Sequence, residues 1–287
     1  MSGLELVSIA AKFALYVGMI LAAGSPLLRL TVLPAVISVE TGRSRFDAWL
    51  VKQVVVGVFL TFAASIALYL LLQLKMAGGD PTLAFAPDFI GIGAQTAVGQ
   101  SVGISLIGCA VAAMSLVFRH KWLAALGALI LVSAFTLQGH TMSIPLDAGW
   151  PVLGRVLLSL TLLLHLLIAS WWFAVLIPLQ VAAGQERDQA ARCFGEWAIK
   201  AVPVLLTAGI VLFLFVTEFQ LDGNDLYQQR MGLKILGVVC VLTLAAMNKL
   251  WLTGKPGLAW SLRIETLAAS AVLMATAWLT STGPGME

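Results

Sequence analysis

Residues 155–180 read RVLLSLTLLLHLLIASWWFAVLIPLQ, a run in which leucine predominates and Arg155 is the only Lys, Arg, Asp or Glu. A helix needs about 20 apolar residues to cross the roughly 30 Å hydrocarbon core of a bilayer, so this stretch is long enough to span a membrane. The rest of the 287-residue chain has the same character, with 60% hydrophobic residues, 11% charged residues and a mean hydropathy of +0.97. Globular proteins carry about 25% charged residues. We therefore expect an all-α membrane protein, and composition argues against a soluble domain, a disordered chain or a nucleic-acid-binding protein.

Apolar stretches separated by clusters of Pro, Gly and charge predict about eight transmembrane helices in a single membrane domain over residues 1–287. The expected helices cover residues 4–28, 51–74, 98–118, 122–140, 155–180, 197–219, 231–252 and 262–282. The longest connection, from Lys75 to Ala97, is rich in Gly and Pro and has room for a short interfacial segment. The first apolar stretch is too long for a signal-peptide core and is expected to be a retained helix.

Lysine and arginine are distributed unevenly between the two sides of the predicted bundle. The connections after the first, third, fifth and seventh helices carry twelve of the 17 basic residues: Arg29, Arg43, Arg45, Lys52, Arg119, Lys121, Arg187, Arg192, Lys200, Lys249, Lys255 and Arg263. The opposite side carries four, Lys75, Arg155, Arg230 and Lys234, and Lys12 lies inside the first helix. The positive-inside rule assigns the richer side to the cytoplasm. We therefore predict that both termini are periplasmic in a bacterium with two membranes.

Two of the three histidines lie within or at the ends of predicted spans. His140 ends the fourth helix in Gly139-His140-Thr141-Met142, and His165 lies about 15 Å down the fifth helix at 1.5 Å per residue. Because a short loop joins these helices, the two imidazoles could approach each other. Imidazole suits copper, zinc, iron and nickel, and the thioether of Met142 suits reduced copper. His140, His165 and Met142 are thus candidate metal ligands; the alternative is that the two histidines are only hydrogen-bonded to neighbouring groups. His120 is expected to lie in a solvated cytoplasmic loop.

Other polar residues within the predicted spans need an explanation, because inserting an ionisable side chain at the middle of a membrane helix costs roughly 2.5 to 3.5 kcal/mol. Glu218 and Lys234 flank one external loop and could pair at the mouth of a cavity. Asn248 closes the seventh helix and Glu265 opens the eighth, both on the cytoplasmic side. These residues could line a pathway, or form structural ion pairs and extend toward the interface.

Motifs of other protein classes are missing from the sequence. Cys109, Cys193 and Cys240 are widely spaced, which argues against a disulfide framework or a zinc module. The sequence has no GxxxxGK, GxSxG or HExxH motif, so we do not expect an enzyme. A haem-bearing redox protein remains an alternative.

The order of several short elements resembles the copper resistance protein D family. Gly139-His140, His165, Trp172 and Leu176-Ile177-Pro178-Leu179 resemble the core of that family. Further similar elements are Arg192-Cys193-Phe194, Thr207-Ala208-Gly209, Tyr227, Leu233-Lys234, Asn248 and Arg263-Ile264-Glu265. They define a core over residues 139–284, whereas the first half agrees only in helix number and layout. Ala174 and Val175 depart from the glycine that the family often has after its tryptophan-aromatic pair.

The resemblance implies a bacterial inner-membrane protein that moves copper, as Cu⁺ or Cu²⁺, from periplasm to cytoplasm beside a small CopC-like periplasmic copper-binding partner. Copper would enter at His140 and Met142, transfer to His165 and leave near Asn248 and Glu265. The residues expected to line the route or to make structural polar contacts are Glu218, Lys234, Asn248, Glu265 and Trp172. Two other functions stay open: a haem-b electron carrier with His140 and His165 as axial ligands, and a subunit that docks or senses a periplasmic copper protein without transporting.

Overall fold

The computed structural model describes residues 3–36, 44–118, 120–137, 151–217, 226–252, 255 and 257–280, which form helices and no strand. The long helices are α1 (Gly3–Thr31), α2 (Arg45–Met76), α5 (Ala97–Phe118), α6 (Lys121–Ser133), α7 (Pro151–Val181), α8 (Gly184–Val216), α9 (Leu226–Met247) and α10 (Leu258–Leu279). The short ones are η1 (Leu33–Ala35), α3 (Pro81–Ala84), α4 (Pro87–Gln95), η2 (Ala134–Leu137) and a π-helical segment, η4 (Asn248–Leu252), that continues α9.

This architecture confirms the predicted all-α, multi-pass membrane bundle. Among the described residues, seven helices are long and apolar enough to cross a membrane: α1, α2, α5, α7, α8, α9 continued by η4, and α10. The remaining expected helix, the fourth (122–140), corresponds to the shorter apolar helix Lys121–Leu137, and residues 138–140 lie outside the described part. Two connections were predicted too long. Residues 184–196 are helical because the charged sequence after Gly184 is made mostly of good helix formers, and α2 begins at Arg45.

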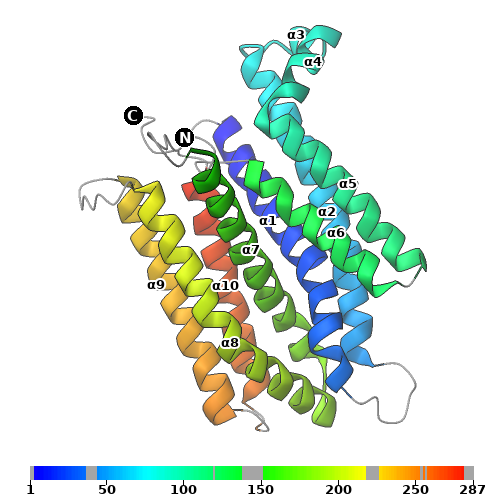
Figure 1. The fold of residues 1–287 in the computed structure, drawn as a ribbon, viewed down its shortest axis with the longest axis vertical. Coiled ribbons are helices and arrows are strands. Elements are labelled where there is room, and N and C mark those ends of the chain that lie inside the picture. The colour runs from blue at the N-terminus through cyan, green and yellow to red at the C-terminus, as the bar shows by residue number, and fades with distance from the viewer. Residues whose placement is uncertain are drawn as a thin grey trace.

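Helices α1 and α7 lie at the centre of the bundle (Figure 1). Helix α1 packs against α2, α6, α7 and α10. At its contact with α7, a Cβ built on Gly24 would lie 2.0 Å from the carbonyl oxygen of Ser170 and 2.6 Å from the Cβ of Ala174. Glycine at position 24 therefore lets the two backbones approach directly, as small residues do between membrane helices. The indole nitrogen of Trp171 donates to the hydroxyl of Thr31 at 2.9 Å and closes the same interface farther along α1.

The start of α1 and the end of α10 lie side by side. Lys12 Nζ donates to the carbonyl of Thr280 at 2.6 Å, and the hydroxyls of Tyr16 and Thr280 are 2.9 Å apart. The short helices α3 and α4 project from this end of the bundle (Figure 1) and occupy the connection predicted between Lys75 and Ala97. Both ends of the described chain are thus at one end of the bundle. Their periplasmic location stays a prediction.

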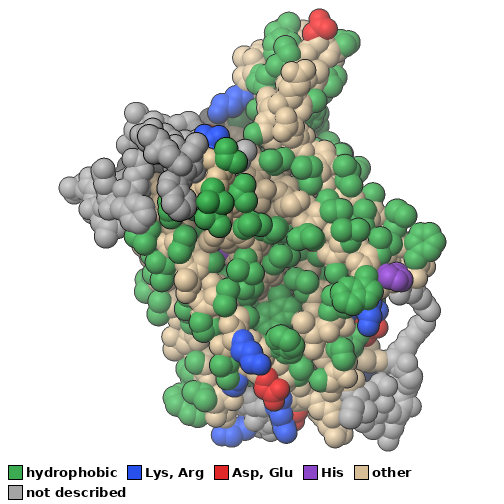
Figure 2. All heavy atoms as spheres, viewed as in Figure 1, with side chains coloured by type: hydrophobic (Ala, Val, Ile, Leu, Met, Phe, Trp, Pro, Cys, Tyr) green, Lys and Arg blue, Asp and Glu red, His purple; other side chains and the backbone are tan. Residues whose placement is uncertain are grey.

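The opposite end, which we call the cation-rich end, is where α1 ends and α2, α6 and α8 begin. Hydrophobic side chains cover the flanks of the molecule, while many Lys and Arg side chains gather toward this end (Figure 2). Three lysines there lie over tryptophan rings: Lys52 over Trp49 (4.8 Å to the ring centroid), Lys121 over Trp122 (6.0 Å) and Lys200 over Trp197 (5.8 Å). Tryptophan gathers at the headgroup level of membranes, so these pairs indicate the level of one membrane–water interface.

Polar contacts at the cation-rich end tie the first half of the chain to the second. Glu186, in the first turn of α8, accepts hydrogen bonds from the hydroxyl of Ser44 and, at 3.0 Å, from the backbone N–H of Phe46. Ser44 is the N-cap of α2 and accepts from the N–H of Asp47 at 3.1 Å. A carboxylate at a helix N-terminus satisfies free N–H groups and complements the helix dipole. The start of α2 is therefore held by α8.

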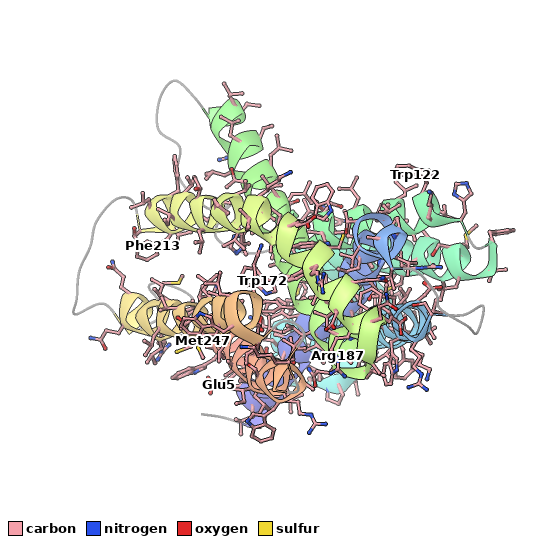
Figure 3. All side chains as sticks on the ribbon, turned by 90° about the horizontal axis from the view of Figure 1, so that it is seen from below. Glu5, Trp122, Trp172, Arg187, Phe213 and Met247 are labelled. Carbon is pink, nitrogen blue, oxygen red and sulfur yellow. The ribbon has the colours of Figure 1, made fainter. Side chains whose placement is uncertain are left out.

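Helices α8 and α9 stand apart in the view from the cation-rich end (Figure 3). Helix α8 packs mainly on α7, and α9 packs mainly on α10. Of α8, only Ala190, Gly195 and Ala208 are fully buried. Helices α8 and α9 therefore enclose the interior less tightly than the helices around α1 do.

Candidate functional site

The imidazole of His165, on α7, is held by the backbone of α8. Its Nδ1 lies 3.1 Å from the carbonyl oxygen of Leu205. A carbonyl can only accept, so this hydrogen bond requires the proton on Nδ1 and leaves Nε2 of the neutral ring with its lone pair. Nε2 makes no hydrogen bond to another described residue. A histidine whose other nitrogen donates to a backbone carbonyl is the common arrangement at metal sites.

Gly209 provides the space that His165 occupies. A Cβ built on Gly209 would lie 3.2 Å from Cε1 of the imidazole and 3.5 Å from its Nδ1. Leu205 and Gly209 are one turn apart, so one face of α8 both fixes the ring and makes room for it. Among the described residues, Lys234 on α9 is the charged group that acts electrostatically on His165. Its positive charge opposes a cation at the imidazole, and Glu218, the predicted partner of Lys234, lies outside the described residues.

A second polar site, after that of His165, surrounds Glu265 of α10, whose side chain is almost completely buried. Asn248 Nδ2 donates to one carboxylate oxygen at 2.6 Å, and Trp172 Nε1 lies 3.4 Å from the other. Asn248 is the first residue of the π-helical segment η4, a kind of local widening that is frequent at functional sites. The structure thus brings Trp172, Asn248 and Glu265 together from three helices, and Trp172 lies inside the bundle in Figure 3.

Each of the two polar sites includes a residue from the same face of α7. His165 and Trp172 are seven residues apart, which places them two turns and about 10 Å apart along that helix. Glu265 lies in the second turn of α10, near the cation-rich end. Gln180, two turns beyond Trp172 on α7, donates from Nε2 to the hydroxyl of Thr266, the neighbour of Glu265, at 2.6 Å. The imidazole of His165 and the carboxylate of Glu265 therefore follow one another toward the cation-rich end.

Part of the predicted ligand set cannot be placed, because His140, Met142 and Glu218 lie outside the described residues. The described residues contain no group of three or more His, Cys, Asp or Glu side chains that could hold a metal ion. They offer instead one imidazole nitrogen and one carboxylate at different depths.

Two features of the site could not be predicted from the types of residue in the sequence. The Leu205 carbonyl that orients His165 is a backbone group, which any residue could supply. The contact between Trp172 and Glu265 joins residues 93 positions apart. Gly209 could be noticed in the sequence, since it belongs to the Thr207-Ala208-Gly209 element of the family resemblance. Its role next to His165 follows only from the packing of α7 on α8.

The family described as copper resistance protein D-like, N-terminal domain, matches residues 3–150. No curated protein and no solved structure matches the chain. The match covers the half in which the sequence agreed with the family only in helix layout, so it supports the resemblance independently of the elements after residue 150. Together with the seven apolar helices, it indicates a multi-pass membrane protein with a role in copper resistance. The chain belongs to the copper resistance protein D-like family.

Proposed function

We propose that the protein transports copper across the bacterial inner membrane, from periplasm to cytoplasm, and is not an enzyme. Family membership supports the link to copper. The observation that carries the transport proposal is the succession of His165 and Glu265 toward the cation-rich end. The first has an imidazole nitrogen available for a metal, and the second is a carboxylate buried within the bundle.

In the proposed route, copper meets His140 and Met142 at the periplasmic mouth and then His165 Nε2. These neutral ligands replace part of the ion's hydration without adding a fixed charge. The ammonium group of Lys234 opposes the ion at His165 and shortens its stay there. Glu265 attracts the ion toward the cytoplasmic side, while Asn248 and Trp172 hold the carboxylate in place.

Copper uptake into proteoliposomes that hold only this chain tests the proposal. Wild-type protein should load an internal copper-sensitive dye, whereas His165→Ala and Glu265→Gln should reduce the initial rate to near that of empty vesicles. Glu196→Gln is the matched control, because Glu196 is an exposed carboxylate on α8. Unchanged copper uptake by both His165→Ala and Glu265→Gln would rule out the proposed route. No uptake by the wild type would favour a subunit that docks or senses a CopC-like periplasmic copper protein.

The same histidine geometry supports a second candidate function. An axial haem ligand also donates its Nδ1–H to a backbone carbonyl, so the contact between His165 and Leu205 suits a haem-b electron carrier with His140 as the other ligand. The absorption spectrum of the purified protein separates the two functions. A Soret band that disappears in His165→Ala supports haem. A protein without that band, which binds copper in a His165-dependent manner, supports transport.

A further inference from the structure

A cavity of about 500 Å³ that is open to the surface lies at the cation-rich end, and residues of the first half of the chain line it. It is lined by Arg29 at the end of α1, Leu33 of η1, and His120, Lys121 and Trp122 at the start of α6. Three of these five side chains are basic, and the other two are apolar. The lining therefore suits a ligand that joins an anionic group to an apolar part.

The basic side chains of this cavity keep donors available. Arg29 Nε donates to a carboxylate oxygen of Asp47 at 2.7 Å, which fixes the guanidinium but engages only one of its nitrogens. Its two terminal nitrogens make no hydrogen bond to another described residue. His120 is exposed and its side chain does not cap α6. Asp47 offsets the charge of Arg29, and the ammonium of Lys121 leaves the group with a net positive charge. A planar guanidinium beside an ammonium is a common arrangement for phosphate oxygens.

The position of the cavity indicates where the anion comes from. Lys121 and Trp122 form one of the three lysine–tryptophan pairs that mark the membrane–water interface. Trp122 is 64% exposed, and a tryptophan exposed at this level lies among lipid headgroups rather than in water. Leu33 adds an apolar wall. A free phosphate ion would gain nothing from these two side chains, whereas a phospholipid could place its glycerol and upper acyl chain against them.

We propose that this cavity binds the phosphate-bearing headgroup of an anionic phospholipid from the leaflet at the cation-rich end. Arg29, His120 and Lys121 contact the phosphate, and Trp122 and Leu33 contact the apolar part of the lipid. Basic pockets between membrane helices bind anionic headgroups in this way. The site is separate from the copper route and does not depend on it.

Native mass spectrometry of the full-length protein with phosphatidylglycerol tests this site. We expect wild-type protein to retain one tightly held phosphatidylglycerol molecule. Removing one basic side chain should weaken retention by roughly fivefold, and the double variant His120→Gln/Lys121→Gln should weaken it further. Lys200→Gln is the matched control, because Lys200 also lies over a tryptophan at this end but does not line the cavity. Equal retention by the double variant and the control would overturn the proposal.

Thermal unfolding distinguishes the lipid from free phosphate and checks that the variants fold. The double variant should match the wild type in phosphatidylcholine nanodiscs and lose the rise in melting temperature that phosphatidylglycerol gives the wild type. Inorganic phosphate added to the phosphatidylcholine nanodiscs should have little effect. If inorganic phosphate alone stabilises the protein as much as phosphatidylglycerol does, the lipid assignment is wrong.

Discussion

The side-chain nitrogen of Asn248 lies 2.6 Å from a carboxylate oxygen of Glu265, where α9 continues into the π-helical segment η4. The hydrogen bond joins the end of the seventh long helix to α10. Because Glu265 is almost completely buried, its carboxylate depends on hydrogen-bond donors of the protein rather than on water. Removing a partner from a buried polar group costs more than the net gain of forming the bond.

Replacing Glu265 by alanine should therefore lower stability as well as copper uptake. Trp172 and Asn248 would lose their acceptor, and we expect a loss of roughly 1–3 kcal/mol in the free energy of unfolding. Glu265→Gln keeps the shape and one acceptor, so it should destabilise less while still losing the charge needed for uptake. Thermal scanning in detergent checks the order of the three melting temperatures. Exposed Glu196→Gln should not change the midpoint, and a similar midpoint for Glu265→Ala would contradict the structural role.

Gly209→Ala should weaken copper binding without unfolding the protein. The added methyl group would lie 3.2 Å from Cε1 of His165, so the imidazole must move by a few tenths of an ångström, which disturbs its hydrogen bond to the Leu205 carbonyl. We expect copper affinity, measured by competition with a chelating dye, to fall by about tenfold, as for the loss of a partner that orients a metal ligand. Gly232→Ala on α9 is the control, because a Cβ there meets nothing within 4 Å. Equal affinity of the two variants would remove Gly209 from the site.

Glu186→Gln should destabilise the contact between the start of α2 and α8. The neutral amide can still accept one hydrogen bond, but it loses the charge that complements the α2 dipole, at a cost of about 1 kcal/mol. A lower melting temperature should be accompanied by faster proteolysis near Ser44. Asp188→Asn is the comparison, since Asp188 lies in the same turn but its side chain makes no hydrogen bond to another described residue. The prediction fails if both variants melt together.

Gly24→Ala should have the largest structural effect of a single added methyl group in this set. Backbone and Cβ atoms of α7 would lie within 2.6 Å of that group, and they cannot rotate away as a flexible side chain could. Overpacking of this kind costs about 1–3 kcal/mol or more. Size-exclusion chromatography and the melting temperature in detergent report the result. Gly103→Ala on α5, where a Cβ meets nothing within 4 Å, should behave like the wild type.

The long helices could be predicted because a lipid-exposed segment must be apolar over its whole crossing. The same reasoning failed at the start of α8, because Glu186, Arg187 and Asp188 make this segment too polar for a hydropathy search. Glutamate and arginine nevertheless favour a helix there. Asn248 and Glu265 could be assigned to the same side of the membrane from charge alone. Their hydrogen bond and the position of Trp172 could not, because helix rotation and packing carry no signature in a single sequence.

The close approach of Gly24 to Ser170 also limits how the two halves can rearrange. Sliding α1 along α7 would drive the side chains next to Gly24 into the opposite backbone, so the halves are fixed at one depth. A change in tilt would also have to keep the hydrogen bond between Trp171 and Thr31, farther along the same interface. Any alternate exposure of His165 and Glu265 to the two sides of the membrane would then have to leave the contact between α1 and α7 in place.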